Sequence, residues 1–378
     1  MIYDHIVLGS GPAGCAAASL LAKNGGTVLI VSRSLRWVAN YGMWVDDIKD
    51  TWASKYLDEP YSTRWDIGES KYLDKKIQFY RPYIMLRNDK VQDDLLSHPN
   101  ITVKIDEIKS VDRVREHVVC RNNTYNGRKI WNALGAMNKF TENESTYWKT
   151  HYQTAIGYVV KFKTPHNRNL STYTLMDWNN DPTPSFAYIF PLDEKQLFIE
   201  ETILIGPKFP FNILRNRLRN RLSDMLSNNK LSNKLSDRTD YEIIKTEYCV
   251  IPMGGLFSSK QYDIGAASGA ISPISGYSVG YVWSTLDDKL FNNITLSRWR
   301  HEVDNTLANI LSQLRNLPYF MFKFLSLPPS YHSGLLQRSS SPLSMIKTIV
   351  RFSTLINLST IFRLSTSLVS IVLKRCGS

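Results

Sequence analysis

The chain has 378 residues, 43% of them hydrophobic and 12% aromatic, which is enough for one large or two ordinary folded domains. Its formal net charge of +12 favours an anionic partner, namely a phosphate ligand, a membrane surface or nucleic acid. The four scattered cysteines lack any metal-ligand spacing, and no stretch reaches the roughly 18 apolar residues of a membrane span, so we expect free thiols, no metal centre and no membrane-spanning helix.

An apolar run, a glycine cluster and a helix of small residues open the chain, at residues 5–8, 9–14 and 16–22. This order predicts a strand, a tight turn and a helix that together bind the pyrophosphate of a dinucleotide. We expect Gly9 to make the turn, Gly11 to let the backbone approach the pyrophosphate, and Gly14 to let the helix pack on the strand. The first helical turn also offers free N–H groups to the phosphates.

The residues between the glycines of this turn indicate which dinucleotide it binds. With Pro12 and Ala13 before its last glycine, it resembles the turn of FAD-dependent oxidoreductases of the glutathione-reductase type. That resemblance implies an α/β fold with a Rossmann-like FAD-binding domain. An acidic residue usually ends the second strand and binds the adenosine ribose. Ser32 and Arg33 stand there instead, so we expect the Ser32 hydroxyl to bind the ribose, more weakly.

The two glycine-rich segments, the strand-rich stretch between them and the basic C-terminal part, together with the resemblance to FAD-dependent oxidoreductases, suggest three regions. We expect a discontinuous FAD-binding domain at residues 1–150 and 245–290, a β-rich substrate domain at 151–244, and a basic helical region at 291–378. In the first region we expect a helix over 87–97, strands over 101–105 and 117–120, irregular structure over 122–150, and short strands or a cap over 50–80. In the substrate domain we expect antiparallel strands at 152–160, 174–178, 186–191 and 196–204.

Two basic segments have apolar residues at helical spacing. After Pro210 the pattern predicts a packed helix whose arginines form a solvated face. From Asn305 to Ser378 there are eight Lys or Arg and no Asp or Glu. That region is expected to be mostly helical, either lying on anionic lipid or packed on the body of the protein.

A second glycine-rich segment, residues 265–278, precedes a helix predicted at 279–286. Its small residues let the backbone approach a flat ligand, and the helix N-terminus can face the electron-rich edge of that ligand. The residues expected to bind the cofactor here are Gly265, Ala266, Pro273, Gly276 and Tyr277.

Taken in order, several segments resemble the lycopene cyclases of plants and cyanobacteria: residues 9–14, 40–46, 153–155, 176–177, 198–202, 251–255, 273–278 and 327–336. The most specific are Asn40-Tyr41-Gly42, Phe198-Ile199-Glu200-Glu201-Thr202 and the Pro-x-x-Gly-Tyr-Ser segment at 273–278. The resemblance implies an intramolecular lyase or isomerase that closes the ψ-end groups of lycopene, or a related linear carotenoid, without net redox change. It also implies reduced FAD as cofactor, with NADPH as the reductant.

The resemblance makes Glu200 the candidate general acid and base and Glu201 a supporting carboxylate. On a strand the two point to opposite faces, so only one of them can face the cavity. A carboxyl buried beside a polyene has a raised pKa and can act as an acid. Asp46 and Asp47 either line the same cavity or serve the loop that carries them.

Three alternatives stay open at this stage. The ring formed is expected to be β, with ε as the other outcome of proton loss. A flavin-dependent monooxygenase or prenyl reductase acting on a lipid would share the fold. A basic nucleic-acid-binding protein is not favoured, because no such module is recognised. We expect peripheral membrane association on a cytoplasmic or plastid thylakoid membrane, with no signal or transit peptide because the predicted fold starts at Ile2.

Overall fold

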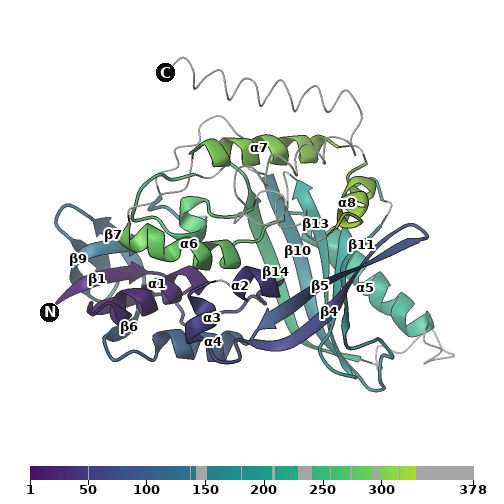
Figure 1. Cartoon of the computed structure of the whole chain (residues 1–378), viewed down its shortest axis with the longest axis horizontal. Coiled ribbons are helices and arrows are strands. Elements are labelled where there is room, and N and C mark those ends of the chain that lie inside the picture. The colour runs from purple at the N-terminus through teal and green to yellow at the C-terminus, as the bar shows by residue number, and fades with distance from the viewer. Residues whose placement is uncertain are drawn as a thin grey trace, which may run out of the picture.

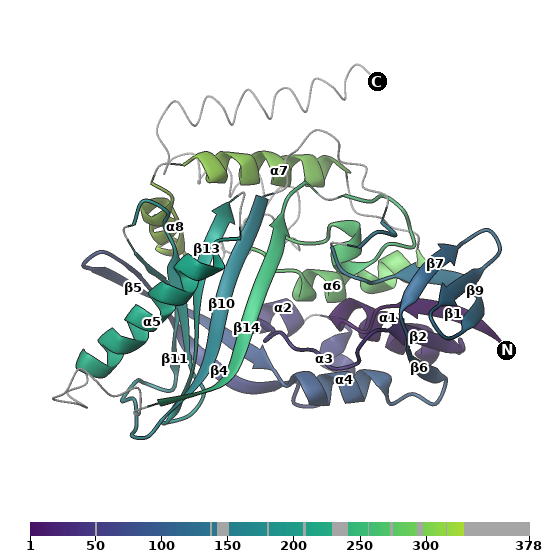
Figure 2. The ribbon, with the colours of Figure 1, turned by 180° about the vertical axis from the view of Figure 1, so that it is seen from behind.

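Two β-sheets and the helices packed on them form the part of the chain that the computed structural model describes (Figure 1). The described residues are 1–49, 51–136, 138–141, 151–179, 181–206, 209–228, 241–255, 257–272, 275–292, 298–314 and 316–328. The smaller sheet lies at one end of the long axis and the larger sheet at the other, with α2 (Val45–Lys49) and α6 (Val279–Phe291) between them (Figures 1 and 2).

The smaller sheet has the order β6-β2-β1-β9-β8-β7. Its strands are β1 (Ile2–Leu8), β2 (Val28–Ser32), β6 (Ile101–Ile105), β7 (Ile108–Asp112), β8 (His117–Cys120) and β9 (Thr124–Asn132). The strands β6, β2, β1 and β9 are parallel, and β7 and β8 add an antiparallel hairpin. Between β1 and β2, α1 (Pro12–Lys23) buries its run of small side chains, and α4 (Asn88–Leu96) precedes β6. This confirms the predicted Rossmann-like α/β core.

The larger sheet has the order β14-β10-β13-β12-β11-β4-β5-β3. Its strands are β3 (Gly42–Trp44), β4 (Tyr61–Tyr72), β5 (Lys75–Leu86), β10 (His151–Phe162), β11 (Thr172–Trp178), β12 (Phe186–Pro191), β13 (Gln196–Gly206) and β14 (Tyr241–Met253). The neighbours are antiparallel except for β11 and β4, which run parallel. The short helices α3 (Ala53–Tyr56) and η1 (Gly265–Ser268) lie in connecting segments.

Helices cover the two faces of the larger sheet differently. On one face, α5 (Phe211–Asn228) packs Leu214, Leu218 and Leu222 against the apolar side chains of β10 and β13 (Figure 2). On the other face, α7 (Arg298–Gln313) and α8 (Leu317–Leu325) join a large aromatic cluster with β4, β5, β11 and β12. Because side chains alternate along a strand, β13 therefore presents even-numbered residues to the aromatic cluster and odd-numbered residues to α5.

The strand assignments differ from the expected regions in three places. The segment 122–150 contains a regular strand, β9, whose first half is polar and whose second half buries Ile130 and Trp131 on opposite faces of the sheet. Residues 61–86 form one long hairpin, β4 and β5, within the larger sheet rather than a set of short strands. That sheet therefore extends beyond the expected range 151–244 at both ends, because β14 continues to Met253.

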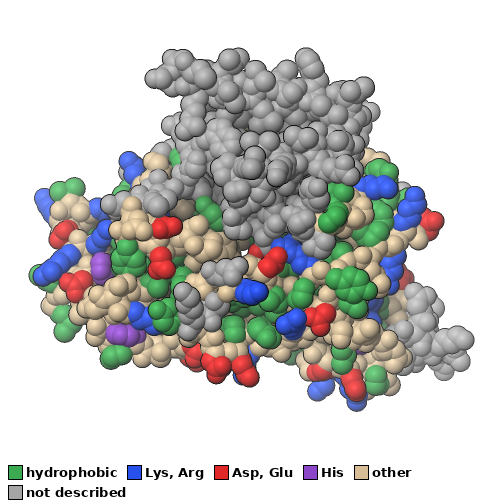
Figure 3. Space-filling view, in the orientation of Figure 1, with side chains coloured by type: hydrophobic (Ala, Val, Ile, Leu, Met, Phe, Trp, Pro, Cys, Tyr) green, Lys and Arg blue, Asp and Glu red, His purple; other side chains and the backbone are tan. Residues whose placement is uncertain are grey.

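Charge is mixed over the described surface. Figure 3 shows Lys and Arg side chains interspersed with Asp and Glu and with apolar side chains on the face it displays. Residues 329–378 contain six Lys or Arg and no acidic residue, and the amphipathic stretch expected there lies outside the described residues. Among the helices that the structure describes, none is long and apolar enough to cross a bilayer.

Candidate active site

The first glycine turn has the geometry that pyrophosphate binding needs. Gly9 has a φ of +101°, and its N–H donates to the carbonyl oxygen of Val31 at 2.8 Å. A Cβ on Gly14 would overlap the carbonyl oxygen of Gly9, so only glycine lets α1 begin this close to the turn. A Cβ on Gly11 would meet nothing within 4 Å. The space beside the N-terminus of α1 is therefore open for phosphates, and the residues fit the cofactor.

The two glycine-rich segments meet in space. Gly265 has a φ of +63°, and a Cβ there would lie 2.5 Å from the Cβ of Ala13. The indole N–H of Trp283, on α6, donates to the carbonyl oxygen of Pro12 at 3.2 Å. Both segments thus meet in one candidate cofactor-binding region. Pro273, also expected to contribute, lies outside the described residues.

Ser32 ends β2, at the position where an acidic residue would bind the ribose. Its hydroxyl is buried and donates to the carbonyl oxygen of Ser34 at 2.8 Å. The hydroxyl of Ser10 lies 3.0 Å away and donates to it. Because the proton of Ser32 is used within the protein, its oxygen could serve a ribose only as an acceptor, and its role stays a prediction.

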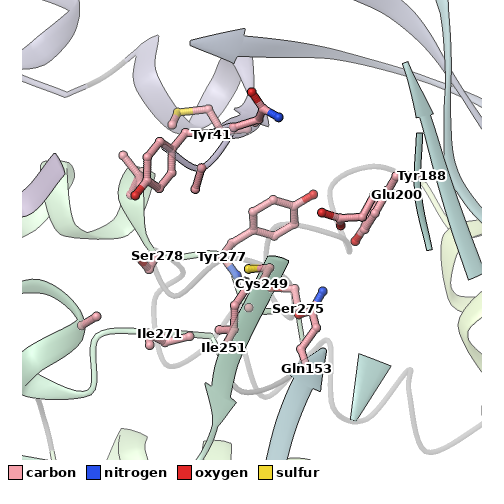
Figure 4. A pocket seen from close by; sticks show the side chains of 18 of the residues that line it. Tyr41, Gln153, Tyr188, Glu200, Cys249, Ile251, Ile271, Ser275, Tyr277 and Ser278 are labelled. Atoms are coloured by element: carbon pink, nitrogen blue, oxygen red, sulfur yellow. Dashed lines mark hydrogen bonds between the residues drawn. The ribbon is translucent and has the colours of Figure 1, made fainter. Parts of the chain in front are cut away.

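A cavity of about 370 Å³ lies between the cofactor-binding region and the larger sheet (Figure 4). On the cofactor side it is lined by Ala266, Gly276 and Tyr277, three of the residues expected to bind the cofactor. On the sheet side its walls are mostly aromatic and come from Tyr83, Tyr188, Phe190 and Phe198. The hydroxyl groups of Tyr83 and Tyr277 are 3.0 Å apart and hydrogen-bonded. An apolar, aromatic cavity beside a cofactor site suits a hydrophobic substrate.

Glu200 points into this cavity from β13, beside Tyr188 (Figure 4). Its carboxylate accepts a hydrogen bond from the Thr202 hydroxyl at 3.0 Å. Burial, and after it the nearby Glu247 carboxyl, together raise the pKa of Glu200 to about 8. Glu200 is therefore largely protonated at neutral pH and can donate a proton.

Glu201 points the opposite way, as expected for neighbours on a strand. It is fully buried under α5, where its carboxylate pairs with the guanidinium of Arg221 at 2.5 Å and accepts a hydrogen bond from Ser185. Arg221 also donates to the carbonyl oxygen of Asp177 at 2.7 Å. The expected solvated face of this helix is thus only partly solvated, because Arg217 and Arg221 turn inward and are 16% and 18% exposed. Glu201 holds α5 on the sheet and does not reach the cavity.

The two acidic residues of the Asn-Tyr-Gly segment also separate. Asp46 is 55% exposed and forms a two-pronged ion pair with the buried guanidinium of Arg81, away from the cavity. Asp47 lines the cavity and packs against Gly280, in the first turn of α6. Burial raises the pKa of Asp47 to about 8, although Arg81 opposes the shift. The structure therefore brings Asp47, rather than Asp46, to the candidate site.

Two further cavity residues were not singled out from the sequence. Glu247 is buried on β14, and its carboxylate accepts hydrogen bonds from both the backbone N–H and the side-chain amide of Asn40. Gln153 is buried on β10, and its amide oxygen has no hydrogen-bond partner among the described atoms. Only strand register brings them to the cavity. No local sequence signal marks Glu247, because its place at the cavity follows from the pairing of β14 with β10.

Solved structures with a similar fold include a halogenase in complex with FAD, a flavin-dependent brominase and a flavoprotein/dehydrogenase. A geranylgeranyl bacteriochlorophyll reductase-like protein from Thermoplasma acidophilum is 14% identical with a TM-score of 0.63, and the match covers 94% of this chain and 99% of that one. A halogenase in complex with FAD is 11% identical with a TM-score of 0.59, covering 97% and 86%. At these identities the similarity establishes the fold.

The family follows from the sequence itself. Residues 4–327 match the model of the lycopene cyclase protein family, and the chain belongs to that family. Tomato neoxanthin synthase is 29% identical over 304 residues, covering 73% of this chain and 57% of the relative. Tobacco lycopene beta cyclase is 26% identical over 306 residues, covering 74% and 58%. The chain thus spans less than two thirds of the length of these relatives.

Proposed function

We propose that this protein is a lycopene cyclase that closes the ψ-end groups of a linear carotenoid into β-rings without net redox change, as in carotenoid biosynthesis. The observation that carries this proposal is the buried Glu200 carboxyl, whose pKa is raised by burial, in an aromatic cavity beside the glycine-rich segments. Family membership and relatives named lycopene beta cyclase support it. In this reading the chain combines a discontinuous FAD-binding domain with a β-rich substrate domain and a helical C-terminal region.

In the proposed reaction Glu200 transfers its proton to the terminal C=C bond of the substrate, which leaves a tertiary carbocation. The neighbouring double bond then attacks that carbon, a ring C–C bond forms, and a proton leaves an adjacent ring carbon to give the cyclohexene. Electron-rich faces of Tyr83, Tyr188 and Phe198 surround the cavity and stabilise positive charge. The apolar walls also exclude water, which would otherwise trap the cation as an alcohol.

FAD is the cofactor that the glycine segments are proposed to bind, in its reduced form and with NADPH as reductant. When bound, reduced FAD supplies negative charge near the cation without transferring a hydride. Gly9, Gly11 and Gly14 would hold its pyrophosphate at the N-terminus of α1. Gly265, Ala266, Gly276 and Tyr277 are also proposed to hold it, and Ser32 is proposed for the ribose.

Replacing Gly11 by alanine tests this cofactor site. Gly11 has extended backbone geometry that alanine also adopts, and its Cβ would meet no protein atom within 4 Å. We therefore expect the free energy of unfolding of the variant apoprotein to lie within about 0.5 kcal/mol of the wild-type value. FAD binding should weaken at least about tenfold, because the methyl group occupies the space through which the backbone reaches the pyrophosphate. Fluorescence titration with FAD and urea unfolding measure both.

Gly206→Ala is the matched control, since a Cβ there meets only Ile203, at an ordinary 3.7 Å. Its FAD affinity should equal that of the wild type. Unchanged affinity in Gly11→Ala would contradict the proposed pyrophosphate site.

Pigment analysis tests the proposed activity. The chain is expressed in a lycopene-accumulating bacterium, and its carotenoids are separated by chromatography and weighed by mass spectrometry. A cyclic product with the mass of lycopene is expected, and the chromatogram distinguishes β-rings from ε-rings. Lycopene left unchanged, with soluble flavin-loaded protein present, would contradict the cyclase proposal.

A second candidate function is redox chemistry on a lipid by a flavin-dependent monooxygenase or prenyl reductase. The fold favours it, because the similar solved structures include a reductase-like protein and a halogenase. Oxygenation or reduction changes the product mass, whereas cyclisation does not. Other relatives are named capsanthin/capsorubin synthase, so an already oxygenated carotenoid should be offered alongside lycopene.

Peripheral association with a membrane follows from the proposed substrate, a hydrocarbon that dissolves in lipid and not in water. The relatives are named as chloroplastic or chromoplastic proteins. We propose a plastid or cytoplasmic membrane surface as the site of action. Sedimentation with anionic liposomes tests it, and binding that DNA does not displace would set the membrane apart from a nucleic-acid partner.

A further inference from the structure

Glu200 belongs to a row of side chains that crosses four strands of the larger sheet. On β12 its partner is Tyr188, and on β10 its partner is Gly157. Gly157 in turn pairs with Glu247 on β14. Directly paired residues carry their side chains on the same face of a sheet. Glu200 and Glu247 therefore stand on the cavity face, with one residue between them, and both line the cavity.

The residue between them has no side chain. A Cβ on Gly157 would lie 2.8 Å from the Phe198 ring and 3.5 Å from the Cβ of Glu200. Neighbouring strands are about 4.8 Å apart, so the two carboxyl-bearing backbones are about 10 Å apart. Long glutamate side chains can lean toward each other over the glycine. Glycine at this position thus lets the two carboxyls act on each other across the gap.

The two carboxyls are hydrogen-bonded differently. Glu247 accepts from the backbone N–H of Asn40 at 3.0 Å and from its side-chain amide at 2.6 Å. The ammonium of Lys245 donates to the amide oxygen of Asn40 at 3.1 Å, which fixes the amide in that orientation. Glu200 receives a hydrogen bond from one neutral hydroxyl, that of Thr202. Burial raises the pKa of both carboxyls, but Asn40 and Lys245 oppose the shift at Glu247, whereas only the Thr202 hydroxyl opposes it at Glu200. The hydrogen bonds therefore favour the anion on Glu247 and the proton on Glu200.

We propose that Glu200 and Glu247 form a two-carboxyl unit that holds one proton, in which the ionised Glu247 keeps the proton on Glu200 until the substrate takes it. This inference rests on the proposed function. The unit carries one negative charge at rest. It carries two while the carbocation exists, because the proton has moved to the terminal C=C bond. When the ring loses its proton to the unit, the single charge is restored, and no other reactant is needed.

Groups on neighbouring elements also face this unit. Titratable or charged side chains that interact with one carboxyl or the other are Tyr188 on β12, Cys249 and Lys245 on β14, and Tyr41 before β3. Burial raises the pKa of each of the phenols and of the thiol, so they stay neutral below pH 9. Lys245 is the cation among them, and it lies on the Glu247 side. The charge that Glu200 senses is therefore set mainly by Glu247.

The dependence of cyclase activity on pH tests this proposal in the full-length, FAD-loaded protein. The wild type should lose activity as pH rises through the pKa of Glu200, because the acid must be protonated. In Glu247→Gln the like charge is gone, so the pKa of Glu200 falls and the midpoint of this loss should move down by about one pH unit. Glu242→Gln, an exposed position on the same strand, should leave the midpoint unchanged. A Glu247→Gln variant with lower activity but an unmoved midpoint would overturn the proposal.

Infrared spectroscopy gives a readout that needs no turnover. The protonated-carboxyl band that disappears in Glu200→Gln belongs to Glu200, and its titration midpoint should fall in Glu247→Gln by the same amount. In Asn40→Ala, which removes an amide donor from Glu247, this band should weaken as the proton moves toward Glu247. An unchanged band in both variants would overturn the proposal even if the protein cyclises lycopene. Conversely, shifted bands in a protein that leaves lycopene untouched would contradict only the proposed reaction.

Discussion

Replacement of Glu200 by glutamine should lower the rate of ring formation by about 10³-fold, the range typical for loss of a general acid. Glutamine has nearly the same size and can still accept the Thr202 hydroxyl, but it has no acidic proton to give. The measurement is the initial rate of cyclic carotenoid formation by purified protein in lycopene-containing liposomes. Glu194→Gln, in the exposed turn before β13, is the matched control and should keep the wild-type rate.

The stability of the same variant shows whether lost activity reflects chemistry or misfolding. The folded-state pKa of Glu200 lies above the ordinary value of 4.5, so the folded protein binds more protons than the unfolded chain between those values. The contribution of Glu200 to stability therefore declines as pH rises from about 4.5 to about 8. Glutamine has no charge to bury, so Glu200→Gln should be at least as stable as the wild type at pH 8. A variant that is stable and fully active would exclude Glu200 as the acid.

Replacement of Glu201 by glutamine should instead act on folding, lowering the free energy of unfolding by about 3 kcal/mol. Its carboxylate is fully buried and forms an ion pair with the guanidinium of Arg221, which points from α5 toward the sheet. Without it the guanidinium loses its nearer partner and keeps only the Asp177 carboxylate, at 3.5 Å. Urea unfolding followed by circular dichroism measures the loss, and Glu194→Gln again provides the control. A decrease of less than about 1 kcal/mol in the free energy of unfolding would mean that the Glu201–Arg221 ion pair contributes little to stability.

A double replacement separates the ion pair from simple packing. If Glu201→Met and Arg221→Met are combined, no unpaired charge remains, so the double variant should be more stable than the sum of the single losses predicts. Additive losses would contradict the coupling. The pH midpoint of activity should stay at its wild-type value in Glu201→Gln, since this carboxyl does not face the cavity. The adjacent glutamates would then have different roles: Glu200 acts in the reaction, and Glu201 stabilises the packing of α5 on the sheet.

The sequence predicted the local elements better than their assembly. The N-terminal turn was recognisable because Gly9 and Gly14 are required by backbone geometry, which a sequence pattern records directly. The strands at 186–191 and 196–204 were recognisable from their long apolar runs. The membership of the β4–β5 hairpin in the larger sheet was not, because it depends on the pairing of β4 with β11, whose residues are distant in the chain.

The candidate site shows the same division. The opposed directions of Glu200 and Glu201 follow from strand geometry alone and were predicted. Which of Asp46 and Asp47 lies at the cavity was not predicted, because it depends on the position of Arg81 on β5. Arg81 forms an ion pair with Asp46, and Asp47 lines the cavity. Glu247 went unnoticed for a related reason: a single buried acid on an edge strand has no local signature until its register with β10 is known.

The parallel pairing of β4 with β11 has a consequence for how the protein reaches its folded state. Strand β4 emerges early from the ribosome, yet its partner, beginning at Thr172 opposite Ile67, is made only after the whole of the smaller sheet. The edge of β4 that pairs with β11 therefore stays exposed while the smaller sheet forms. Such long-range contacts slow folding and leave an unpaired strand edge that can form hydrogen bonds with other chains. We therefore expect the β4–β5 hairpin to complete its pairing late, which makes it a place to look for chaperone contact during synthesis and for aggregation at high expression.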